Sequence, residues 1–159
     1  MDYKRTKYSM IFLLIFIFSI SCKDDPVSNN VDFQLNSIEQ EVHRLINLHR
    51  SGIGLQPLEW NDVIAEQCRN HSIDMANAHT INHDGFDDRI NKIGETISWS
   101  WAGENVAYDY GAQFVVESWL SSPGHKENIE SNSNLTGVGV AFDEDSVMYF
   151  TQIFIRSTN

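Results

Sequence analysis

The strongest structural signal in this sequence is a predicted β-hairpin near its C-terminal end. Valines alternate with glycine and alanine from Leu135 to Phe142, and apolar or β-branched residues alternate again from Val147 to Ile155. A period of two is typical of β-strands. The polar residues 143–146 between the two runs are the predicted turn. The chain therefore has to fold around an antiparallel sheet.

Helical and extended patterns precede this hairpin. Spacings of three and four between apolar residues predict helices over residues 35–50, 61–78 and 112–120, and a short helical turn over 87–93. Ser37 and Asn61 are the predicted N-caps of the first two helices, and Pro123-Gly124 is predicted to end the third. Residues 97–107 form a predicted strand, in which Gly103 marks a bend or a close approach. This order indicates an α+β fold with helices covering a mainly antiparallel sheet.

The N-terminal residues have the pattern of an export signal. A basic start precedes an apolar run over residues 10–18, which is far shorter than a membrane span. Small residues then lead to Cys22, as in bacterial lipoproteins, whose cysteine is lipidated and becomes the mature N-terminus. We predict a signal peptide over 1–21, a polar flexible tether over 22–36 and one domain over 37–159. The alternative is a simple secretory signal with cleavage nearby.

This prediction places the protein in the outer membrane or on the cell surface of a Gram-negative bacterium, held in the membrane by its lipidated Cys22. The residues directly after the cysteine, Lys23-Asp24-Asp25, resemble a short tag found on some surface lipoproteins.

Charge and cysteine content exclude several classes of function. The chain has 11 basic and 22 acidic residues, and removal of residues 1–21 leaves 8 and 21, a formal charge of −13. Nucleic acid is therefore excluded as the main partner, because phosphate binding needs clustered lysines and arginines. With only Cys22 and Cys68, the chain has neither a disulfide framework nor a cysteine-rich zinc site. Cys68 has helical spacing with apolar residues, which predicts a buried, unreactive thiol.

Three residues stand in turns at the edges of predicted elements, where side chains can point into a cleft: His83, Glu104 and His125. Imidazole nitrogen and carboxylate oxygen are suitable ligands for zinc and similar divalent ions. The same set can perform general acid–base chemistry, or can form a hydrogen-bonded network that only stabilises the cleft. Three other histidines, on or near helix faces, are predicted to pack or cap: His49, His71 and His79.

A series of short motifs extends from residue 37 to residue 156. In order, they are Leu45–Arg50, Leu58–Trp60, His71–Ala76, His83 with Phe86–Arg89, Gly103–Ala107, Trp119–His125 with Asn128, Gly137–Val140 and Thr151-Gln152. Together they resemble the CAP superfamily, the SCP-like domain of cysteine-rich secretory proteins, antigen 5 and plant pathogenesis-related 1 proteins. The resemblance implies a three-layer α-β-α sandwich whose cleft holds two histidines and two acidic residues that can bind a divalent cation.

The resemblance assigns three of these cleft positions to His83, Glu104 and His125. Two further positions depart from the family pattern. Met148 stands where many relatives have a histidine, and thioether sulfur does not replace imidazole as a zinc ligand. Ser122 stands where a second glutamate is usual, and Glu117 belongs to a polar helix face that we interpret as solvated. The resemblance thus implies a His-Glu-His core with weak or absent binding of a cation such as zinc.

We expect a monomeric binding module at the cell envelope, with a lipid, a glycan or an extracellular protein as its ligand. The alternative is a peptidase-like hydrolase, either metal-assisted or acid–base, in which Glu104 is the base and His83 and His125 are metal ligands or proton carriers. The tryptophans at element ends are predicted to pack rather than to line a ligand groove: Trp99, Trp101 and Trp119.

Overall fold

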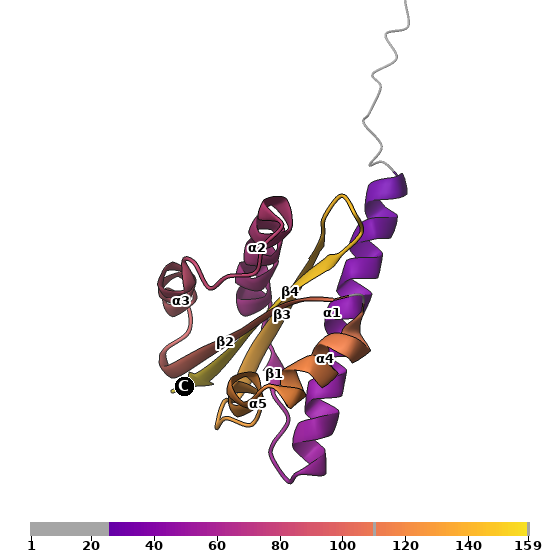
Figure 1. Ribbon diagram of the computed structural model, residues 1–159. Coiled ribbons are helices and arrows are strands. Elements are labelled where there is room, and N and C mark those ends of the chain that lie inside the picture. The colour runs from indigo at the N-terminus through magenta and orange to yellow at the C-terminus, as the bar shows by residue number, and fades with distance from the viewer. Residues whose placement is uncertain (1–25, 110, 159) are drawn as a thin grey trace, which may run out of the picture.

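Figure 1 shows the computed structural model, which describes residues 26–109 and 111–158, with side chains from residue 36 onward. The predicted signal peptide over 1–21, Cys22 and the charged residues 23–25 lie outside the described residues. No helix within the described part of the chain combines the length and the apolar character that a membrane crossing requires.

The described residues form five helices and four strands. The helices are α1 (Pro26–Gly52), α2 (Asp62–Ala78), α3 (Phe86–Gly94), α4 (Ala112–Ser121) and α5 (Pro123–Ile129). The strands are β1 (Glu59–Trp60), β2 (Trp99–Asp109), β3 (Leu135–Phe142) and β4 (Met148–Ser157). They form one sheet in the order β1-β3-β4-β2, in which only the short β1 pairs in parallel. The predicted α+β class and the mainly antiparallel sheet are confirmed.

Helices cover both faces of this sheet (Figure 1): α1, α4 and α5 lie on one face, and α2 and α3 on the other. The hairpin of β3 and β4 lies at the centre. Eight consecutive residues of β4, 148–155, are buried, since both faces of the strand meet helices. β2 is the edge strand beside β4, and it pairs with β4 along nearly its whole length. Side chains from both helical layers can therefore meet around the free edge of β2.

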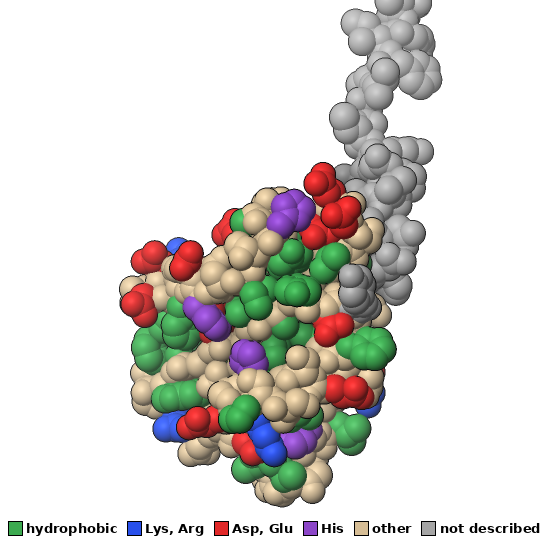
Figure 2. Space-filling view, viewed as in Figure 1, with side chains coloured by type: hydrophobic (Ala, Val, Ile, Leu, Met, Phe, Trp, Pro, Cys, Tyr) green, Lys and Arg blue, Asp and Glu red, His purple; other side chains and the backbone are tan. Residues whose placement is uncertain are grey.

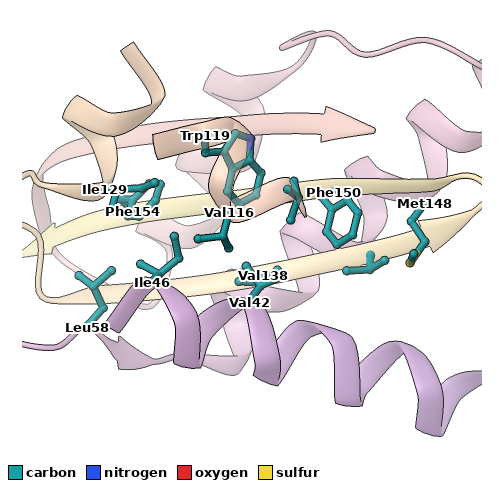
Figure 3. Close-up of a cluster of buried hydrophobic side chains, with 12 residues drawn as sticks. Val42, Ile46, Leu58, Val116, Trp119, Ile129, Val138, Met148, Phe150 and Phe154 are labelled. Carbon is teal, nitrogen blue, oxygen red and sulfur yellow. The ribbon is translucent and has the colours of Figure 1, made fainter. Parts of the chain in front are cut away.

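The larger hydrophobic core lies between the sheet and the layer of α1, α4 and α5. Figure 3 shows Val42 and Ile46 of α1 directed toward Val138 of β3, with Trp119 of α4 above them. Trp119 is fully buried, as predicted for a packing tryptophan. Burying a side chain of this size stabilises the fold by about 1.5–3 kcal/mol.

On the opposite face, α2 lies directly against the backbone of β3. A Cβ atom added at Gly139 would lie 2.1 Å from the backbone nitrogen of Arg69, and one added at Gly137 would lie 2.2 Å from that of Ala65. These distances are too short for any side chain, so glycine is required at both positions. The alternation of glycine and valine in this strand thus places a helix on one face and apolar side chains on the other.

Two element boundaries differ from the sequence predictions. α1 begins at Pro26, so residues 26–36, predicted as part of a flexible tether, are helical, and Ser37 lies inside the helix rather than capping it. Pro123 ends α4 as predicted, but it also begins α5, a helix that the sequence analysis missed. Proline is favoured at the first position of a helix because its missing N–H has no helical partner there. The N-cap of α2 is confirmed: Asn61 accepts hydrogen bonds from the backbone of Val63 and Ile64.

Candidate functional site

The candidate site is built around Glu104, in the middle of the edge strand β2. Its side chain is only 2% exposed and lies on the face covered by α2 and α3, beside its cross-strand partner Ile153. At the preceding position in the strand, Gly103 makes room for α5, since a Cβ there would lie 2.8 Å from the Asn128 side chain. The close approach predicted at this glycine is confirmed.

The Glu104 carboxylate is held by Arg89 of α3. The guanidinium donates from Nε to Oε2 at 3.0 Å, and from Nη2 to Oε1 and Oε2 at 2.9 and 2.6 Å. Nη1 donates to the backbone oxygen of Asp84 at 2.7 Å, which also holds the guanidinium in place. Such a fork is among the strongest side-chain interactions. The sequence analysis quoted Arg89 only as part of a motif and gave it no role.

His83, in the loop between α2 and α3, completes this chain of side chains. Its Nδ1 lies 2.8 Å from Oε1 of Glu104, while its side chain is 56% exposed. An ionised carboxylate only accepts hydrogen bonds, so Nδ1 carries the proton and Nε2 is left facing outward. The structure thus brings His83 and Glu104 together, and the order of contact is Arg89, Glu104, His83.

His125 reaches the same region from the opposite helical layer. It lies in the first turn of α5 and is half-buried. Burial lowers the pKa of its imidazole, and the nearby charge of His83 lowers it further. Asn105 donates to the backbone oxygen of His125, and Asn128 donates to the backbone oxygen of Glu104, so amide side chains hold α5 against β2. Figure 2 shows two histidine side chains close together near the middle of this face of the molecule.

Apolar surface continues from this polar group along β2. Val106 and Tyr108 follow Glu104 on the same face of the strand; Val106 is buried, whereas Tyr108 is 59% exposed. The ring of Tyr108 lies 6.1 Å from that of Tyr149 on β4. Figure 2 shows apolar side chains gathered beside the histidines on this face. A ligand at Glu104 would therefore meet imidazole at one end and aromatic surface at the other.

The hydrogen bonds around Glu104 do not suit the coordination of a divalent cation by its carboxylate. Both of its carboxylate oxygens already accept hydrogen bonds from Arg89, and Oε1 also accepts from His83. Among residues 26–109 and 111–158, no three histidine, cysteine, aspartate or glutamate side chains converge as metal ligands do. The free nitrogen of His83 and the imidazole of His125 are the donors left to a cation. Zinc binding by His83, Glu104 and His125 stays a prediction.

The two positions that depart from the family pattern take no part in the hydrogen bonds among Arg89, Glu104 and His83. Met148 belongs to the larger hydrophobic core, on the face of β4 that meets α1. Ser122 forms the junction between α4 and α5. Glu117 is exposed and accepts a hydrogen bond from Gln113 at 2.6 Å, which confirms the solvated polar face predicted for it.

The other histidines and Cys68 have structural partners. His71 donates from Nε2 to the backbone oxygen of Asn82, His49 binds Glu130, and His79 forms the C-cap of α2. Cys68 is fully buried, as predicted, and burial raises the pKa of its thiol, which disfavours the reactive thiolate.

Comparison with known proteins gives one consistent result. A sequence model described as the cysteine-rich secretory protein family (CAP) matches residues 43–154. The uncharacterized membrane protein YlbC of Bacillus subtilis is 35% identical over 74% of this chain and 34% of its own length. The uncharacterized protein YkwD of the same organism is 32% identical over 76% of this chain and 48% of its own length. The chain thus spans about a third to a half of the curated relatives it matches.

Solved structures have the same fold. An extracellular protein containing an SCP domain from Bacillus anthracis superposes with a TM-score of 0.69 at 29% identity, covering 86% of this chain and 45% of that one. An outer surface protein from Borrelia burgdorferi superposes with a TM-score of 0.68 at 24% identity, over 75% of this chain and 92% of that one. The three-layer α-β-α arrangement implied by the family resemblance is confirmed.

Proposed function

The chain belongs to the cysteine-rich secretory protein (CAP) family, and we propose that it is an exported binding module whose ligand enters the cleft at His83, Glu104 and His125. The observation that carries the proposal is the contact order Arg89, Glu104, His83. It presents an oriented imidazole on a side chain that is 56% exposed, and the exposed Tyr108 lies further along the same face of β2.

The location and the ligand class are part of the same proposal. A lipid anchor on Cys22 would hold the domain at the outer membrane or the cell surface, and the ligand would be an envelope lipid, a glycan or an extracellular protein. Two solved relatives support this location by their descriptions, one as an extracellular protein and one as an outer surface protein. The apolar surface beside the imidazole supports an amphipathic ligand, because polar and apolar groups would both find partners there.

The test compares two buried glutamates that differ in position. The purified protein, Glu104→Gln and Glu39→Gln are screened against phospholipid vesicles, peptidoglycan fragments and envelope proteins. Glu39 is also buried and paired with an arginine, but it lies between α1 and α2, away from His83. We expect Glu104→Gln to weaken binding about tenfold or more, and Glu39→Gln to leave it unchanged. Absence of binding to every class, or equal loss in both variants, would reject the proposal.

A second candidate is acid–base hydrolysis, favoured by one specific observation. An imidazole whose Nδ1 donates to a carboxylate and whose other nitrogen faces outward is arranged to accept a proton from a bound water. In this version His83 is the base and Glu104 orients it, which reverses the role expected for Glu104, because Arg89 occupies the carboxylate.

The hydrolase candidate is tested with the wild-type protein, His83→Ala and Glu104→Gln on peptide substrates. We expect turnover only in the wild type. Absence of turnover in all three proteins would reject the hydrolase candidate.

A further inference from the structure

A second cavity lies on the other face of β2, beneath α5. It has a volume of about 730 Å³, which is within the usual range for ligand sites of about 300–1,000 Å³. Its lining combines Trp101, two cationic residues and two acidic residues, and amide and hydroxyl groups from the loop after α5. The charged residues are Lys126, Arg156, Glu127 and Glu130. Trp101 and Glu104 point to opposite faces of β2, so this cavity is distinct from the His83 cleft.

Arg156 is the unusual residue in this cavity. Within residues 26–158, five of the seven lysines and arginines have a carboxylate within 4.0 Å, and a sixth, Arg50, is buried among four backbone oxygens. Arg156 has no carboxylate partner in the described part of the chain. Its Nε donates to the backbone oxygen of Asn132 at 2.9 Å, and its guanidinium carbon lies 5.8 Å from the centre of the Trp101 ring.

These contacts fix the guanidinium without neutralising it. The Asn132 bond occupies Nε only, and the outer nitrogens Nη1 and Nη2 make no hydrogen bond within the described residues. These two nitrogens can donate one hydrogen bond each to the two oxygens of a carboxylate. Lys126 lies 3.8 Å from the Glu130 carboxylate, so of the two cations in the lining only Arg156 is without a carboxylate within the described residues. Figure 2 shows few basic side chains on this face, and some lie at its lower edge, where Figure 1 places α5 and the end of β4.

The remaining lining indicates which carboxylate fits. Trp101 packs partly against the larger core and contributes its exposed apolar part to the cavity, beside the Arg156 guanidinium, while Asn132 and Ser131 add amide and hydroxyl groups. A sugar ring presents both features, since its C–H face packs on an aromatic ring and its hydroxyls pair with amides. We propose that this cavity binds an acidic saccharide, with the sugar carboxylate on Arg156 and the sugar ring against Trp101.

The test titrates the full-length protein with N-acetylmuramic acid, N-acetylneuraminic acid and digalacturonic acid, each beside its methyl ester. Binding is followed by tryptophan fluorescence and by the NMR signals of the indole N–H groups. The acids should bind and the esters should bind at least about tenfold more weakly, the loss expected for one charge-assisted hydrogen bond. Arg156→Gln should bind the acids more weakly than the wild type by the same factor. The affinity of Arg156→Lys should lie between those of the wild type and Arg156→Gln, because lysine keeps the charge but not the paired donors.

Matched controls separate this cavity from other sites. Arg44→Gln removes an exposed arginine that already has a partner, Glu41, and should bind the acids as the wild type does. Glu104→Gln should also bind them normally, so failure here and failure of the proposed function are distinguishable. Equal binding of acids and esters, no binding of any acid, an unchanged affinity in Arg156→Gln, or binding of an acidic peptide in place of the sugars would each overturn the proposal.

Discussion

Two buried glutamates in this protein are each paired with an arginine, but their other neighbours differ. Glu39 of α1 is held by Arg69 of α2 through bonds of 2.7–3.0 Å, and Glu104 of β2 is held by Arg89 of α3 in the same way. The third partner differs. Glu39 accepts from the backbone N–H of Val140, whereas Glu104 accepts from His83, a half-exposed side chain.

The two pairs differ in that only the one at Glu104 holds a histidine side chain. A buried glutamate–arginine pair by itself joins elements of the structure, as Glu39 joins α1 to α2 and β3. The pair at Glu104 does the same for α3 and β2, but it also orients an imidazole at the free edge of the sheet. In the proposed function, ligand binding therefore depends on the imidazole attached to the pair, whereas stability depends on the burial of the pair itself.

Loss of the more buried arginine should have the largest effect. Arg89→Ala leaves the Glu104 carboxylate buried and unpaired, which should lower the free energy of unfolding by about 3–5 kcal/mol. Arg69→Ala should lower it by about 1–3 kcal/mol, since the Arg69 side chain is 40% exposed and water can replace part of it. Urea unfolding of both variants measures the difference. A larger loss in Arg69→Ala would mean that the Glu104 pair is the weaker of the two.

Neutralising the glutamates should have a smaller effect. Glu104→Gln leaves the buried Arg89 without a full charge partner, and we expect a loss of about 1–3 kcal/mol. Glu39→Gln should lose less, because burial raises the pKa of Glu39 despite Arg69, so its ionised form already carries a net cost. The two unfolding curves at neutral pH test this order, and the reverse order would contradict it.

Removal of the imidazole should barely change stability. His83→Ala removes a side chain that is 56% exposed, so the free energy of unfolding should change by about 0.5 kcal/mol or less. Ligand binding at the cleft should nevertheless fall about tenfold. Thermal unfolding and the binding screen separate the two effects. A large loss of stability in this variant would favour the purely structural network.

Stability should depend on pH in opposite directions at the two regions. The raised pKa of Glu39 means that the folded state holds its proton more tightly, so this group adds stability as the pH falls through its titration. The lowered pKa of His125, caused by burial and then by His83, means that stability from this group is lost as the pH falls below the ordinary histidine range. The free energies of unfolding of Glu39→Gln and His125→Gln are measured between about pH 4 and pH 7. Each variant should lack the pH dependence that the replaced group contributes. Unchanged slopes would reject the assignment.

Much of the fold follows from local patterns in the sequence. The hairpin, the cap at Asn61 and the strand through Gly103 depend on residues close to one another in the chain, and the structure confirms them. Both errors in element boundaries lie at a proline. Residues 26–36 were predicted as tether from their polar composition, and Pro123 was predicted only to end a helix, but Pro26 and Pro123 each stand at the start of a helix.

The site was only partly predictable because its supports are distant in sequence. His83 and Glu104 follow from their turns and from the family resemblance, but Arg89 was missed. A signal was present: Arg89 lies four residues before Ile93, on the buried face of α3. A buried arginine requires hydrogen-bond acceptors, and a carboxylate is a common one. Pattern alone does not identify that partner, which comes from a strand 15 residues further along the chain.

The protonation state of the His83 ring nitrogens decides whether the cleft is built as described. Glu104, fixed by Arg89, accepts a hydrogen bond from Nδ1 of His83. Nitrogen-15 NMR of the wild-type protein at about pH 8, where an ordinary imidazole is neutral, should show the proton on Nδ1 and an unprotonated Nε2. A proton on Nε2, with Nδ1 bare, would contradict the orientation of His83 on which the proposed cleft depends.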